Sequence, residues 1–331
     1  MNISDILLGA AIIIAAPAVN RVGEAKAQQI HPDQVVVDSP FVHDPVLAYE
    51  NGKYYLYSTG HGISQMTSAD RKHWTLCREG VLKNHEIPAW THDSVPGFHT
   101  HIWAPDVIRY RNKWYLAYSC STFGKNTSAI GLLSNTSLAN MDGWKAIDPN
   151  FVIDDKGNPW MTWGSFWDGI QLVKLDKKTM HVKKGAKPQT IARRHAFGDA
   201  SAEPNPTSKF AGTNAIEAPF IMKHGGYYYL FVSWDYCCRG IKSNYRVAVG
   251  RSKNVAGPYL DKNGKDMRNG GGTLILEGDK KEFEAMGHCS AYSFPDGDFF
   301  FCHGYSIAKN GASILVQKKI NWTENGWLTL E

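Results

Sequence analysis

The sequence has few cysteines and no cluster of basic residues. Its 331 residues include six cysteines, which form no C-x-x-C pair and show no zinc-finger spacing. Disulfide bonds therefore cannot be the main source of stability in a chain this long. The adjacent Cys237-Cys238 pair is either a vicinal disulfide or two buried thiols. The net charge is only +5 and no Lys/Arg run appears, so nucleic acid is not an expected partner.

Long hydrophobic runs are also missing. Residues 6–19 form an apolar stretch of 14 residues, too short to span a bilayer comfortably. The A-x-A pattern of Ala25-Lys26-Ala27 follows it, so we expect a signal peptide over residues 1–27 and a secreted or periplasmic protein with no membrane contact after processing. Asp5 stands where such signals normally carry a basic residue. An apolar anchor, or a wrongly assigned start of translation, is the alternative.

Long helical periodicity is absent, and a hairpin pattern recurs five times in its place. Each copy has a polar loop, a short apolar strand, a Gly or Asn turn and an alternating aromatic strand. The turn-and-strand pieces are residues 51–58, 111–119, 156–165, 224–233 and 296–303. Third strands are predicted at residues 64–68, 129–133, 170–175, 245–250 and 312–317. Fourth strands are predicted around residues 74–77 and 327–330.

Four antiparallel strands repeated five times predict an all-β fold, a five-bladed β-propeller. The high aromatic content, 12%, suits β-structure. With 43% hydrophobic residues the chain can bury one large core, and we expect a single five-bladed domain over residues 28–331. A β-sandwich with similar hairpins is the alternative.

The loops that open the repeats carry polar residues at matching places. A propeller brings such loops together at its central channel. Asp44 and Asp148 directly precede a proline, whereas Trp103 and Glu217 stand two residues before one. The fifth loop carries His288. Three carboxylates, a tryptophan and a histidine are therefore expected around one axis.

Carboxyl groups crowded into a partly dry cleft have their pKa values pushed apart, which separates an acid from a base. Hydrolysis of a glycosidic bond needs this division, because one carboxyl protonates the leaving oxygen and another activates water or attacks the anomeric carbon. Alternatively, each acid merely caps a turn, since Asp before Pro is common in loops.

Several motifs resemble the endo-arabinanases of glycoside hydrolase family 43. The resemblance runs from about residue 40 to the C-terminus, and its motifs are His43-Asp44-Pro45, His101-Ile-Trp-Ala-Pro-Asp106, Ala146-Ile-Asp-Pro149, Trp163-Gly-Ser-Phe-Trp-Asp-Gly169, Glu217-Ala-Pro219 and Asp235-Tyr-Cys-Cys-Arg-Gly240. It implies an inverting enzyme that cleaves internal α-1,5-L-arabinofuranosyl bonds of plant cell-wall arabinan. Asp44 then matches the general base, Asp148 the residue that orients and tunes the acid, and Glu217 the general acid.

The same resemblance implies ligand sites. His288 matches a histidine that holds a calcium-type ion through waters, and no organic cofactor is expected. By position and resemblance, Trp103 and Phe123 are expected at sugar subsites, followed by Trp167, with Ser165 as a polar partner for sugar hydroxyls. We expect a monomer.

Two loops depart from the family pattern and keep other modes of action open. The stretch at residues 135–145 is short, and the stretch at residues 193–214 is long. Loops at the channel mouth decide between an open groove and a closed pocket. The alternatives are therefore an exo-acting arabinanase, an arabinofuranosidase or a β-xylosidase on this scaffold. A non-catalytic carbohydrate-binding propeller and a protein-interaction platform are further alternatives.

Overall fold

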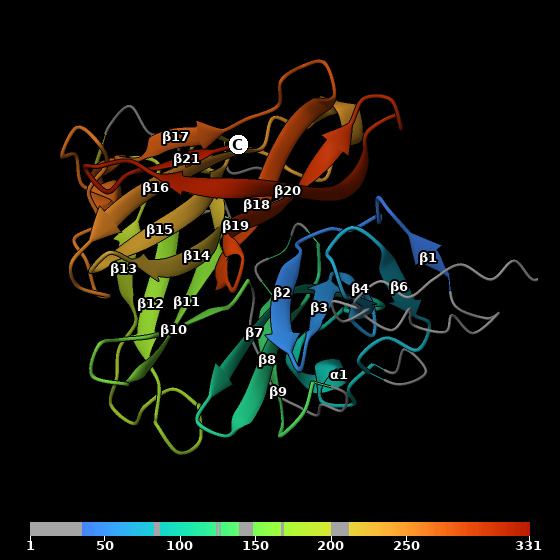
Figure 1. Cartoon of the computed structure of the whole chain (residues 1–331). Coiled ribbons are helices and arrows are strands. Elements are labelled where there is room, and N and C mark those ends of the chain that lie inside the picture. The colour runs from blue at the N-terminus through green and yellow to red at the C-terminus, as the bar shows by residue number, and fades with distance from the viewer. Residues whose placement is uncertain are drawn as a thin grey trace, which may run out of the picture. The chain divides into compact units, whose positions relative to one another are not determined.

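The computed structural model describes residues 35–82, 87–123, 125, 127–138, 148–166, 169–199 and 212–331, which fold into five antiparallel sheets (Figure 1). Within these residues the single α-helix, α1, spans Thr91–Ser94, and short 3-10 turns lie at Gly212–Asn214, Gly240–Lys242 and Met267–Asn269. No described helix is long and apolar enough to cross a membrane. The expected signal peptide over residues 1–27 lies outside the described residues.

Each sheet is one blade, formed mostly by strands that follow one another in the chain. Blade 1 has the order β1-β6-β5-β3-β2, with β1 (Val36–Val37), β2 (Val46–Glu50), β3 (Lys53–Ser58), β5 (Ser64–Ser68) and β6 (Trp74–Cys77). Blade 2 has the order β4-β7-β8-β9, with β4 (Gly60–His61), β7 (His101–Tyr110), β8 (Lys113–Ser121) and β9 (Ser128–Asn135).

The remaining blades each place four strands in chain order. Blade 3 contains β10 (Asn150–Ile153), β11 (Pro159–Ser165), β12 (Gly169–Lys174) and β13 (Gln189–Ala192). Blade 4 contains β14 (Ile216–His224), β15 (Tyr227–Trp234), β16 (Arg246–Ser252) and β17 (Thr273–Leu276). Blade 5 contains β18 (Phe283–Phe294), β19 (Gly297–Ser306), β20 (Ala312–Trp322) and β21 (Leu328–Leu330).

The innermost strands close a ring, which confirms the five-bladed propeller. Each of β2, β7, β10, β14 and β18 contacts the next, and β18 contacts β2. The predicted third and fourth strands are present. Strands β5 and β6 match the predicted bounds, β20 runs five residues beyond its predicted end at residue 317, and the others shift by one or two residues at their ends. The sequence repeat predicted the fold because each blade buries its apolar face only against its neighbours.

The hydrophobic core lies between the blades. Five clusters of buried side chains each join two adjacent blades. Trp74 and Leu56 of blade 1, for example, pack with Phe301 of blade 5, and all three are fully buried. Removing one blade would therefore expose the apolar faces of both its neighbours.

At the head of every innermost strand one residue has a left-handed backbone. The φ angle is +57° at Asp44, +32° at Ala104, +39° at Asp148, +51° at Ala218 and +48° at His288. Register shifts follow at the same place in β7, β14 and β18. Bulges of this kind redirect side chains at sheet ends. We call these five the head residues.

A hydrogen bond from the preceding blade holds four of the head residues. The backbone N–H of Ala104 donates to Thr59 Oγ1 at 2.8 Å, and that of Asp148 donates to Ser119 Oγ at 2.7 Å. The N–H of His288 donates to Ser233 Oγ at 2.9 Å. The N–H of Asp44 closes the ring by donating to His303 Nδ1 at 3.1 Å. These acceptors satisfy N–H groups that the left-handed turns would otherwise leave unpaired.

The seam between blades 1 and 5 also contains an ion pair. The Arg71 guanidinium contacts both carboxylate oxygens of Asp296, at 2.5 and 3.1 Å. It lies over the rings of Tyr54, Phe294 and Phe299 at 4.2–5.3 Å. Only 9% of Arg71 is exposed, so its loss would leave a cavity beneath the three rings, whereas the Asp296 side chain is 54% exposed and stays in contact with water.

We therefore expect Arg71→Ala to lower the free energy of unfolding by about 2–3 kcal/mol, measured by urea denaturation. The control is Arg268→Ala, which removes an exposed pair with Asp266 and should cost below about 1 kcal/mol. Equal losses in the two variants would show that the seam contributes no more than an ordinary surface pair.

Candidate functional site

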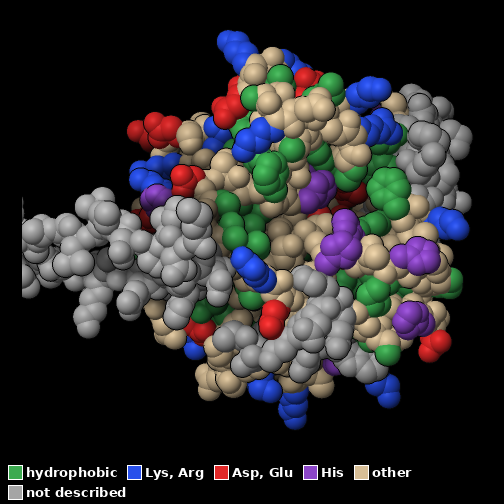
Figure 2. Space-filling model, turned by 90° about the vertical axis from the view of Figure 1, so that its right-hand side faces the viewer, with side chains coloured by type: hydrophobic (Ala, Val, Ile, Leu, Met, Phe, Trp, Pro, Cys, Tyr) green, Lys and Arg blue, Asp and Glu red, His purple; other side chains and the backbone are tan. Residues whose placement is uncertain are grey.

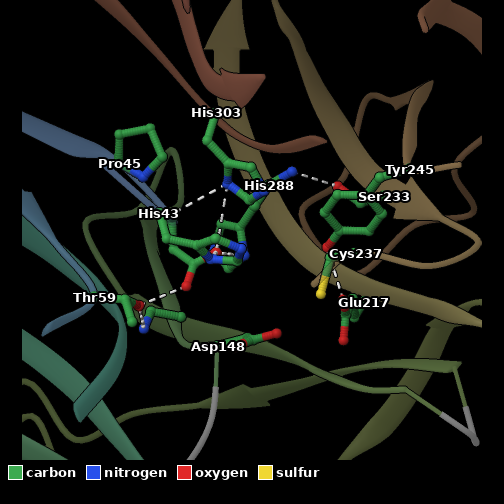
Figure 3. Close-up of polar contacts among 12 residues, drawn as sticks. His43, Pro45, Thr59, Asp148, Glu217, Ser233, Cys237, Tyr245, His288 and His303 are labelled. Carbon is green, nitrogen blue, oxygen red and sulfur yellow. Dashed lines mark hydrogen bonds and ion pairs between the residues drawn. The ribbon is translucent and has the colours of Figure 1, made fainter. Parts of the chain in front are cut away.

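The candidate site lies at the channel mouth where the head residues meet. Histidine side chains gather on this face of the molecule, beside a recess in which acidic atoms are visible (Figure 2). Asp148, Glu217 and His288 come from three different blades and point into the same space (Figure 3). The structure thus brings together the carboxylates and the histidine that the repeat comparison predicted.

Asp44 accepts hydrogen bonds on both carboxylate oxygens. Its Oδ1 lies 2.7 Å from His43 Nδ1 and 2.9 Å from His288 Nδ1, and its Oδ2 accepts from Thr59 Oγ1 at 2.5 Å. Because Thr59 already accepts the N–H of Ala104, its own proton is free to point at Asp44. Although burial alone raises it, the imidazoles of His288 and His43 hold the pKa of Asp44 well below its usual range. Asp44 is therefore ionised.

Glu217 is in the opposite state. Burial, reinforced by the neighbouring Asp148 carboxylate, raises the pKa of Glu217 to about 8. Tyr245 Oη donates to Glu217 Oε1 at 2.8 Å. Gly287 permits this approach, because a Cβ at that position would lie 2.1 Å from Tyr245 Cδ1. Glu217 therefore carries a proton at neutral pH.

Asp148 lies between these two extremes. Burial raises its pKa to about 6, while the N–H of Ala218 and the charge of His288 favour the ionised form. Its carboxylate is in turn one cause of the raised pKa of Glu217. Three carboxyl groups at one mouth, Asp44 buried and the other two half-buried, thus titrate over different ranges, which is the separation that acid–base chemistry requires.

His288 lies half-buried beside these carboxyl groups. Although burial alone lowers it, the Asp44 carboxylate raises the pKa of His288 to about 9. The residues fit the expected calcium-type ion only in part. Ca²⁺ takes six to eight oxygen ligands, whereas His288 Nδ1 already contacts Asp44. In the described part of the chain, the clusters close enough to share an ion both contain His43 and neither contains His288. An ion beside His288 would take most of its ligands from water.

Two of the predicted substrate-binding aromatics lie together near the mouth. The rings of Trp103 and Phe123 meet edge to face with centroids 6.1 Å apart. Phe123 is 69% exposed, and a large apolar ring that open is available for stacking on a sugar. Ser165 ends strand β11, and nothing is described of its side chain. Trp167 lies outside the described residues.

Other residues of the site had no assigned role in the sequence analysis. They are Thr59, Tyr245, His43, His303 and Tyr305. The repeat did contain a signal for one of them, His303, because the aromatic strands end at Ser119, Ser233 and His303, and the structure shows all three holding head residues. The structure also decides the cysteine question, since Cys237 and Cys238 form a vicinal disulfide.

A closed propeller with an ionised and a protonated carboxyl at one mouth is the arrangement of a glycoside hydrolase. Comparison of the sequence with known families agrees with this class. The profile of the family described as "Glycosyl hydrolases family 43" matches residues 34–328. The chain belongs to glycoside hydrolase family 43.

Several characterised proteins are similar to the chain. The extracellular exo-α-(1→5)-L-arabinofuranosidase ArbA of Cellvibrio japonicus is 40% identical over 305 residues, covering 86% of this chain and 85% of ArbA. The extracellular endo-α-(1→5)-L-arabinanase 1 of Bacillus subtilis is 38% identical, covering 86% of each chain. The crystal structure of an exo-1,5-α-L-arabinanase from a bovine ruminal metagenomic library has a TM-score of 0.79 and 50% identity, and covers 89% of this chain and 97% of its own.

The raised pKa of Glu217 has a consequence for stability. Between about pH 4.5 and 8 the folded protein binds a proton at this position that the unfolded chain has released, so stability falls as pH rises through this range. Glutamine does not titrate, so Glu217→Gln should remove this fall in stability with pH. Its amide oxygen can still accept the hydrogen bond from Tyr245. We expect the variant to have a higher melting temperature than the wild type at pH 8, with a smaller difference at pH 5.

Thermal unfolding of both proteins at the two pH values tests this expectation. Glu324→Gln is the control, because Glu324 is exposed and its substitution should change the melting temperature little at either pH. A Glu217→Gln variant that melts below the wild type at pH 8 would contradict the protonated state of Glu217.

Proposed function

We propose that the chain is an arabinan endo-1,5-α-L-arabinosidase that hydrolyses internal α-1,5-L-arabinofuranosyl bonds with inversion. One observation carries the catalytic part. An ionised carboxylate, Asp44, and a protonated one, Glu217, belong to the same channel mouth of a family 43 propeller. Arabinan as the substrate is supported by the similar arabinan-degrading enzymes.

In the proposed reaction Asp44 is the general base and Glu217 the general acid. Asp44 takes a proton from a water molecule as the water oxygen forms a bond to the anomeric carbon. Glu217 gives its proton to the glycosidic oxygen as the bond from that oxygen to the anomeric carbon breaks. Asp148 keeps Glu217 protonated by its charge. The hydrogen bond from Tyr245 orients the Glu217 carboxyl group.

Trp103 and Phe123 are the proposed sugar-stacking residues, and Ser165 and Trp167 stay candidates for the same groove. His288 is our candidate protein ligand for a calcium-type ion that is otherwise held by water. When bound, such an ion supplies positive charge beside the carboxylates. We propose that the protein acts outside the cytoplasm, as the extracellular relatives do and as an A-x-A-terminated signal over residues 1–27 would require.

The assignment of acid and base predicts different responses to the leaving group. Glu217→Gln should lower kcat on linear arabinan by about 10²–10⁴-fold. On a 4-nitrophenyl α-1,5-arabino-oligosaccharide, the kcat of this variant should return most of the way to the wild-type value, because nitrophenolate leaves without protonation. Asp44→Asn should be as impaired on the activated substrate as on arabinan. Steady-state kinetics on both substrates provide the measurement. Equal recovery in the two variants would contradict the assignment of Glu217 as the acid and Asp44 as the base.

An exo mode is the second candidate, because the 50% identical ruminal enzyme and the 40% identical ArbA are both named exo-acting. We expect an early ladder of oligomers of mixed length from debranched arabinan, separated by anion-exchange chromatography. A single short product from the first time point would establish the exo mode. Failure to cut arabinan while releasing sugar from xylan would point to a β-xylosidase.

A further inference from the structure

Three side chains behind Asp44 form a hydrogen-bonded chain that the proposed mechanism does not use. Tyr305 Oη lies 2.9 Å from His43 Nε2 and 3.2 Å from His303 Nε2. It also accepts the backbone N–H of Cys238 at 2.7 Å. His43 and His303 stack with ring centroids 3.8 Å apart, and both lie close to the mouth in Figure 3.

The tautomer of His303 follows from its backbone partner. His303 Nδ1 accepts the N–H of Asp44, so this nitrogen carries no proton. The proton must then be on Nε2, which points at Tyr305. Burial holds the pKa of His303 well below its usual range, so the ring stays neutral. The 3.7 Å contact between His303 Nδ1 and Asp44 is consequently no ion pair.

The direction of the Tyr305 hydroxyl follows next. Its oxygen already accepts two N–H groups, from Cys238 and His303, and a phenol oxygen has two lone pairs. It cannot accept a third proton from His43. A 2.9 Å contact between nitrogen and oxygen nevertheless needs a proton between them, so Tyr305 donates to His43 Nε2 in preference to its other side-chain partner, Ser243, whose oxygen already accepts the N–H of Arg239. Burial raises the pKa of Tyr305, and the phenol keeps the proton that it donates.

His43 is thereby fixed with its proton on Nδ1, which faces Asp44 Oδ1 at 2.7 Å. The other tautomer would aim a lone pair at the carboxylate and repel it. We propose that Tyr305, held by Cys238 and His303, is a positioning residue that sets the tautomer of His43 and so orients Asp44 as the catalytic base. This inference rests on the proposed function.

Tyr305 acts through His43, because Tyr305 is only 3% exposed and His303 is fully buried. The hydrogen-bonded chain also includes a residue of the vicinal disulfide. The N–H that donates to Tyr305 belongs to Cys238, which has a φ angle of +65° and is bonded to Cys237. The Cys238 sulfur lies 3.7 Å from His43 Nε2 on the same side.

A double-mutant cycle tests the inference. Asparagine at position 43 can place its amide N–H where His43 Nδ1 stands, but it needs no proton from Tyr305. Tyr305→Phe in the wild type should lower kcat by about 10–100-fold with KM changed less than about threefold. In the His43→Asn background the same substitution should change kcat by less than about twofold. The loss should persist on the 4-nitrophenyl substrate, because it affects the base and not the acid.

Tyr292→Phe is the matched control. Tyr292 Oη also accepts a backbone N–H across the seam, from Leu47 at 3.0 Å, but this hydrogen bond goes to the backbone of strand β2 and not to His43. It should leave kcat within about twofold of the wild type, because only stability is affected. An equal loss in Tyr292→Phe and Tyr305→Phe, or the same loss from Tyr305→Phe in both backgrounds, would overturn the inference.

Two further variants keep the test decisive if Tyr305→Phe folds poorly. His43→Asn should retain at least tenfold more activity than His43→Gln, whose longer amide cannot mimic Nδ1. Similar activities in these two variants would contradict the tautomer argument. Asp44→Asn distinguishes a failure of the proposed function from a failure of this inference. An active Asp44→Asn variant would refute the catalytic assignment of Asp44. An inactive one, together with additive effects of Tyr305→Phe and His43→Asn, would refute only the role of Tyr305.

Discussion

The rest of the site depends on the hydrogen bond through which one blade holds the head residue of the next. A left-handed turn followed by a bulge directs a side chain toward the channel, but it leaves a backbone N–H without a partner in its own sheet. A hydroxyl or imidazole on the preceding blade accepts that N–H in four of the five places. Folding and site assembly are therefore one event, because a head residue is positioned only when its neighbouring blade is in place.

The second constraint is the shortage of water around three acidic groups. Burial alone disfavours the charged form of each one, and the positive partners are distributed unequally. Asp44 has two imidazoles and a hydroxyl and is ionised, whereas Glu217 has a phenol and a neighbouring carboxylate and is protonated. The difference in role comes from these partners, since Asp and Glu have similar intrinsic acidity.

The fold and the three carboxylates could be predicted because both depend on patterns within short stretches of the sequence. Each hairpin has its own turn and aromatic strand, and a proline marks Asp44, Asp148 and Glu217 in matching loops. The partners of these groups were not predictable, because the contacts join distant segments. His43 and Tyr305 are 262 residues apart, and Asp44 and His303 are 259 apart. His288 illustrates the limit: its position was found from the repeat, but its contact with Asp44 required the closed ring.

The backbone brace separates the scaffold of the site from its chemistry. At the four braced heads it uses the N–H of the head residue and makes no demand on the side chain, which is alanine at 104, aspartate at 44 and 148, and histidine at 288. These four geometrically equivalent positions around one axis can thus change identity with little effect on the scaffold that holds them. Substitution of a side chain at such a position can therefore change the chemistry of the channel mouth while the backbone hydrogen bond that holds the position stays in place.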